Sequence, residues 1–144
     1  MKQFIVLLAV LPLLLVFVLQ VSLDQRRETV QALVAAEVTA VCNEARAEGG
    51  FSRNVQERFC RRLAERLQEA GISIAPADIT IAADEGPMYR QNSFQEGDKR
   101  GLIAYEICVP VGVRMAGAQL FGIAKEENRG VLRFCGTLAS ELLP

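Results

Sequence analysis

The side chains that could do chemistry in this chain are carboxylates, cysteines, serines and tyrosines, because its 144 residues include no histidine. Histidine is the commonest general base and metal ligand, so its absence excludes histidine-based triads, HExxH zinc sites and mixed Cys/His zinc sites. The serines show no SxxK pattern, and we expect Tyr89 and Tyr105 to be packing or interface residues. We predict no catalytic residue and no enzymatic activity.

Two adjacent acidic pairs, Asp84-Glu85 and Glu126-Glu127, could supply carboxylates for acid–base chemistry or for calcium. Neither pair has the spacing of an EF-hand, and adjacent acids in glycine-flanked loops are ordinarily solvated. The glycines of residues 112–122 are not part of a GK[ST] phosphate loop. We therefore predict no metal site, no cofactor and no identifiable small-molecule substrate.

Four cysteines, Cys42, Cys60, Cys108 and Cys135, are the candidate disulfide residues. None belongs to a CxxC motif, which argues against a zinc ribbon or a thioredoxin-like site. An even number of cysteines in a small exported domain favours two disulfides, and four buried thiols in a cytoplasmic domain are the alternative. Cys42 and Cys60 lie at comparable distances along the chain from an expected helical turn at Gly49-Gly50, which favours pairing them. Cys108 and Cys135 lie at comparable distances from the connection between their two strand-like segments, which favours the second pair.

The elements that position these residues begin with an apolar segment. Residues 4–19 are apolar apart from the conformationally restrictive Pro12, and no charge lies between Lys2 and Asp24. As a helix, residues 4–23 would span about 30 Å, the thickness of the hydrocarbon core of a bilayer. We predict a retained transmembrane anchor over residues 1–23. A cleaved signal peptide is the alternative, but its apolar region would be unusually long and no small-x-small cleavage pattern follows.

Charge gives little indication of a polyanionic partner, since 16 basic residues face 17 acidic ones. The arginines of residues 53–66 are interleaved with glutamates, as on a solvated helix face, so we predict no nucleic-acid binding. The positive-inside rule gives no clear orientation, because positive charge is similar on the two sides of the anchor. Lys2 lies on one side, and Arg26 and Arg27 lie on the other. The candidate disulfides would form outside the cytoplasm. We therefore predict a single-pass cell-membrane protein whose residues 24–144 are extracytoplasmic.

The anchor helix should continue into a long first helix, which forms a helical hairpin with a second helix over residues 24–71. Apolar residues recur every three, four or seven positions from Leu23 to Ala45, and Gly49-Gly50 should end this first helix. Ser52 is a good N-cap for a second helix, which Gly71 should stop. The apolar stripe could face a partner or be covered by the domain's own sheet.

Strand patterns occupy residues 72–144. Alternation predicts strands at residues 79–83, 102–113 and 131–138, with a loop over residues 85–101 and a short helix or apolar loop at residues 115–123. Pro110 cannot donate to a ladder and marks an edge or a strand end. Strands collected after helices favour an α+β fold, a small three-stranded antiparallel sheet covered on one face by helix.

The segment LPLLLVF at residues 11–17 resembles the LPLLLLLL stretch of TadE-like proteins, pseudopilin-like components of the tight-adherence (Flp) pilus of bacteria. The resemblance covers about the first 25–30 residues and the pilin-like layout of an N-terminal transmembrane helix entering a small domain. Val6 stands where such proteins carry a glutamate, and no glycine precedes Gly49. The resemblance therefore implies a membrane-resident accessory protein more than a major fibre subunit.

The sequence is compatible with three functions. The first is a non-enzymatic pilin-like or accessory subunit of a pilus or secretion machine, with lipid and other membrane or pilus-assembly proteins as partners of the N-terminal helix. The second is a membrane-tethered sensor that binds a small ligand or envelope polymer in a concave pocket. The third, an enzyme, would have to use carboxylates or a cysteine alone.

Overall fold

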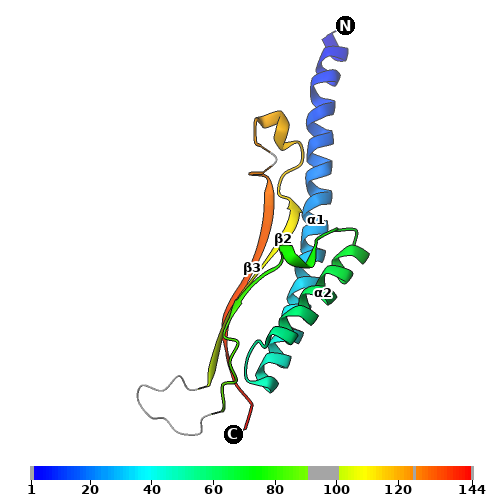
Figure 1. The fold of residues 1–144 in the computed structure, drawn as a ribbon. Helices are drawn as coiled ribbons and strands as arrows, with labels where there is room; N and C mark the ends of the chain where they lie inside the picture. The colour runs from blue at the N-terminus through cyan, green and yellow to red at the C-terminus, as the bar shows by residue number, and fades with distance from the viewer. Residues whose placement is uncertain (1, 91–100, 125, 144) are drawn as a thin grey trace.

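The computed structural model describes residues 2–90, 101–124 and 126–143. Its elements follow in the order α1 (Lys2–Glu48), α2 (Arg53–Glu69), the 3-10 turn η1 (Pro76–Asp78), β1 (Thr80–Ala83), β2 (Leu102–Val113), the 3-10 turn η2 (Ala118–Phe121) and β3 (Arg129–Ala139). The strands form one antiparallel sheet in the order β1-β2-β3 (Figure 1). The predicted α+β class and the order of its elements are confirmed, while most of the predicted loop at residues 85–101 lies outside the described residues.

Helix α1 is a single 47-residue helix that passes through Pro12 without ending. The predicted continuation of the anchor segment into the first helix of the domain is confirmed, and residue 23 lies inside this one helix. The helix ends where predicted, because Gly49 adopts a left-handed φ of 81° that other residues resist. Ser52 caps α2, its hydroxyl oxygen accepting from the Val55 amide at 3.4 Å.

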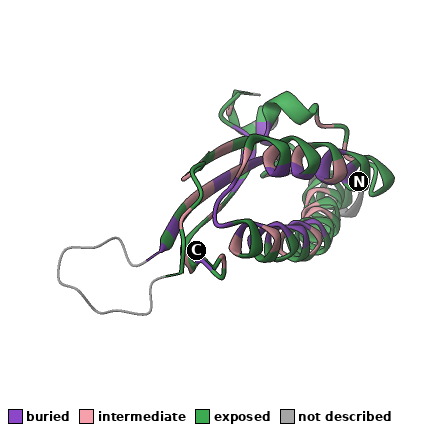
Figure 2. Cartoon of the chain, turned by 60° about the horizontal axis from the view of Figure 1, so that its bottom comes forward, coloured by how far each residue is buried: buried purple, intermediate pink, exposed green. Residues whose placement is uncertain are grey.

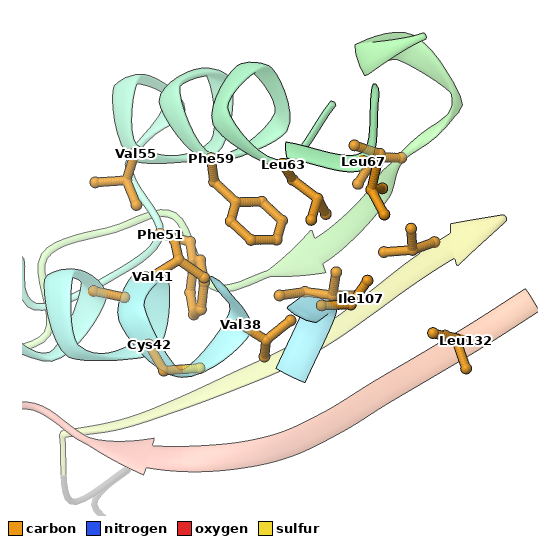
Figure 3. Close-up of a cluster of buried hydrophobic side chains, with 14 of the residues drawn as sticks. Val38, Val41, Cys42, Phe51, Val55, Phe59, Leu63, Leu67, Ile107 and Leu132 are labelled. Carbon is orange, nitrogen blue, oxygen red and sulfur yellow. The ribbon is translucent and has the colours of Figure 1, made fainter. Parts of the chain in front are cut away.

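The hydrophobic core lies between the two helices and one face of the sheet (Figure 3). Helix α1 contributes a stripe at helical spacing, α2 contributes residues four apart, and β2 contributes alternate residues. Figure 2 colours these buried residues purple. The main side chains are Val30, Val34, Val38, Val41, Phe51, Val55, Phe59, Leu63, Leu67, Ile103, Ile107, Val109 and Leu132. From Val30 onward, therefore, the apolar stripe of α1 is covered by the chain's own domain.

The sheet departs from the predicted alternation at one end of β2. Ile103, Ile107 and Val109 are buried as expected, but Val113 is exposed because the register with β3 shifts between Pro110 and Val113. Pro110 lies in the central strand and not on an edge strand. It is tolerated there because β1 pairs with β2 only from Tyr105 to Cys108, so this part of β2 has no partner on that side.

An ion-pair network joins the two helices and accounts for the arginine-rich segment. Glu37 on α1 is almost fully buried. Its carboxylate accepts a hydrogen bond from Arg62 Nε at 2.8 Å and forms an ion pair with Arg66 Nε at 3.1 Å. Arg58 pairs with Glu48 at 3.2 Å across the same seam. Opposite charges on facing helices thus fix the hairpin, and the predicted solvated face is in part a contact between helices.

Candidate functional site

The first half of α1 is the most unusual surface of the molecule. It contains a stretch long and apolar enough, by length and composition, to cross a membrane, and none of that stretch is buried within the protein. Leu13 is 68% exposed and Phe17 is 66% exposed, whereas Val34 and Val41 on the second half are fully buried. One rigid helix therefore carries two surfaces, a core face and a bare apolar rod that projects beyond the sheet (Figure 1).

The connection between β2 and β3 lies against this rod. The Ala116 amide donates to Gln20 Oε1 at 2.9 Å, although the two residues are 96 positions apart. Gln20 Nε2 in turn donates to Asp24 Oδ1 at 3.1 Å. Val16, Gln20 and Leu23 are the half-buried positions of this stretch, and their spacing of four and three places them on one helix face. Sequence reasoning missed this contact, and the polar Gln20 inside an apolar run was the available signal.

A cleft opens beside this contact, where α1 leaves the domain. It has a volume of about 820 Å³ and lies between α1, the segment after α2 and the ends of β2 and β3. Arg26, Arg27 and Arg129 line it together with Asp78, so the charge among its described residues is mainly positive. Arg26 is engaged, since its Nη2 donates to the Gly71 carbonyl oxygen at 2.6 Å. The volume falls within the range of about 300–1,000 Å³ that is typical of ligand pockets.

The four cysteines are free thiols, so the two predicted disulfides are not formed. Cys108 is paired in register with Arg133, and Cys135 with Glu106, so the two cysteines are diagonal neighbours and not directly opposite. Diagonal Cβ atoms are about 7–8 Å apart or somewhat less, against about 3.5–4.5 Å in a disulfide. Cys42 is buried and points toward the sheet, away from the helix that carries Cys60 (Figure 3).

The thiols of the helical hairpin are not activated for nucleophilic chemistry. Burial raises the pKa of Cys42, opposed in part by a hydrogen bond with Tyr105, and burial also raises the pKa of Cys60. Burial, followed by interaction with Cys42, raises the pKa of the Tyr105 hydroxyl. A thiol must lose its proton to attack, so these shifts work against cysteine catalysis.

The predicted carboxylate pairs are not brought together into a site. Asp84 is structural, because its Oδ2 accepts from the Ala104 amide at 2.9 Å and so ties the end of β1 to β2. Glu85, Glu126 and Glu127 are exposed. Within the described ranges, no group of three or more acidic or cysteine side chains is placed to hold a metal ion.

Comparisons with protein-family models, with curated proteins and with solved structures find no match to this chain. What the chain does must therefore be inferred from its own geometry. Its two distinctive features are the bare half of α1 and the domain end that touches it.

Proposed function

We propose that this chain is a non-enzymatic, single-pass membrane protein, a pilin-like or accessory subunit in the assembly of a bacterial surface pilus or secretion machine. Residues 24–144 would be extracytoplasmic. The observation that carries the proposal is the division of α1 into an exposed apolar half and a buried half. The resemblance of residues 11–17 to TadE-like proteins gives the direction of the functional proposal.

The geometry suits assembly because the two halves of α1 are continuous. A bare apolar helix is stable in lipid, where its backbone hydrogen bonds are internal, and there it can pack laterally against other helices. The core on the second half then holds the domain at a fixed position relative to the anchor.

Photo-crosslinking in native membranes tests this function. A photoreactive amino acid would replace Leu13 or Phe17, whose side chains are exposed on the anchor, and Tyr89 at the far end of the domain would serve as the matched site. We expect protein adducts of discrete mass from the anchor positions. Adducts with lipid alone at both anchor positions, together with a monomer in mild detergent, would contradict assembly.

The cleft favours a second function, a membrane-tethered module that binds an anionic ligand. Arg27 and Arg129 line it beside apolar Ile72 and Ile74, a combination that suits a ligand with an acidic group and an apolar part. A ligand that binds only the native state raises the midpoint of thermal unfolding. A screen of amphiphilic anions on the full chain, repeated on Arg27→Gln, tests this: a shift lost in the variant supports binding, and no shift with any anion contradicts it.

A further inference from the structure

The connection between β2 and β3 has the composition of a lipid-facing loop. Residues 115–124 contain no charged side chain, and Phe121 is 59% exposed at the end of η2. Charged residues return at both ends of the loop. Arg114 precedes it, and Lys125, Glu126, Glu127 and Arg129 follow it. An apolar tip between charged flanks, with an exposed aromatic residue at the tip, is compatible with a segment that lies at a membrane surface.

The contact with α1 places this loop at membrane depth. Ala116 bonds to Gln20, which lies four residues before Asp24, the first charged residue after Lys2. At 1.5 Å per residue, Gln20 is about 6 Å closer to the bilayer centre than Asp24 along the helix axis. From there the loop continues alongside α1 toward its N-terminal end (Figure 1). If α1 spans a bilayer whose surface lies near Asp24, this loop lies at the depth of that leaflet.

Several backbone groups of the loop have hydrogen-bond partners within the protein, an arrangement that favours a lipid environment. Asn128 is buried and closes the loop, its side-chain amide donating to the Met115 carbonyl and accepting from the Met115 amide, both at 2.9 Å. Within the tip, the Ile123 amide donates to the Ala118 carbonyl at 3.1 Å. Non-helical backbone is tolerated in a membrane only where its polar groups have partners of this kind.

We propose that residues 115–124 insert into the bilayer beside the anchor, on the leaflet nearest the domain, and so form a second point of membrane attachment. This inference rests on the proposed membrane anchoring of α1. The anchor and the loop would together set the orientation of the domain relative to the membrane. The loop would cover one face of α1, and the other faces would stay open to neighbouring helices. The arginine-lined cleft then lies at the level of the lipid headgroups.

The absence of tryptophan from the chain permits a direct test. Three single-tryptophan variants of the full chain, Phe121→Trp, Phe17→Trp and Tyr89→Trp, would be reconstituted in phosphatidylcholine vesicles. All three positions are exposed aromatic residues, so the replacements need little repacking, and far-UV circular dichroism checks the fold. Lipids brominated near the headgroup end or near the tail end of the acyl chain then report the depth of each tryptophan by quenching.

We expect Phe121→Trp to emit at shorter wavelength than Tyr89→Trp and to lose emission with the shallow brominated lipid. We expect Phe17→Trp to be quenched and Tyr89→Trp to be unaffected. Quenching at residue 17 without quenching at residue 121 would overturn the loop insertion and leave the anchor intact. This holds even if the tryptophan at residue 121 emits at short wavelength, because a protein neighbour can produce that shift without lipid contact. Absence of quenching at residue 17 would overturn the anchor itself, and the loop insertion with it.

Discussion

Replacing Glu37 by glutamine should loosen the helical hairpin, because its carboxylate is the buried centre of the network between α1 and α2. The side chain of Glu37 is 7% exposed and forms ion pairs with Arg62 at 2.8 Å and with Arg66 at 3.1 Å. Removing one member of a fully buried pair costs about 3–5 kcal/mol, since the remaining charge stays buried. Here the side chains of Arg62 and Arg66 are 36% and 58% exposed and can be rehydrated, so we expect about 1–3 kcal/mol.

Thermal unfolding followed by far-UV circular dichroism in detergent measures this loss. One kcal/mol corresponds to about 4 °C in a domain of this size, so Glu37→Gln should lower the midpoint by about 4–12 °C. The matched control is Glu57→Gln, because Glu57 pairs with Arg53 across an exposed i,i+4 contact on α2 alone. Such a pair contributes about 0.5 kcal/mol or less. Equal midpoints for the two variants would refute the network's role in joining the helices.

Three further predictions concern the core, the thiols and the turn between the helices. Phe59→Ala should destabilise the domain by about 3–5 kcal/mol in urea unfolding, because Phe59 is fully buried between the helices and the sheet. The exposed Cys135 should react quickly with a maleimide. Cys42 should react only slowly, because it is buried and burial raises the pKa of its thiol. Equal rates would contradict this placement. Gly50→Ala should cost about 1–3 kcal/mol, because the new Cβ would lie 2.6 Å from the Gly86 carbonyl oxygen, whereas Gly86→Ala meets no atom within 4 Å and should change the midpoint little.

Local patterns predicted most of the fold because they depend on neighbours in the chain. The glycine stop at Gly49 and the cap at Ser52 were visible in the sequence, and so was the alternation from Ile103 to Val109. The burial of the stripe that includes Val34 follows from the same helical period. These features need only the spacing of residues along one element.

Features that depend on tertiary contacts could not be predicted from the sequence. The register shift after Pro110 is set by how β3 pairs with β2, and it exposes Val113 against the expected alternation. The two disulfides were predicted from distances along the chain, but Cys108 and Cys135 differ by one diagonal step in register. The bond from Ala116 to Gln20 joins residues that no local pattern connects. The loop and the cleft beside the anchor therefore became visible only in three dimensions.

The most direct test of the membrane anchor is to ask whether the mature protein keeps residues 1–23 and where it fractionates. Cells expressing the full chain would be separated into soluble and membrane fractions, the membranes washed with alkaline carbonate, and the protein analysed by intact-mass spectrometry. We predict a carbonate-resistant membrane protein whose mass includes the apolar segment, since about 20 apolar residues bind a bilayer in effect irreversibly. A soluble product that lacks the first two dozen residues would contradict the account.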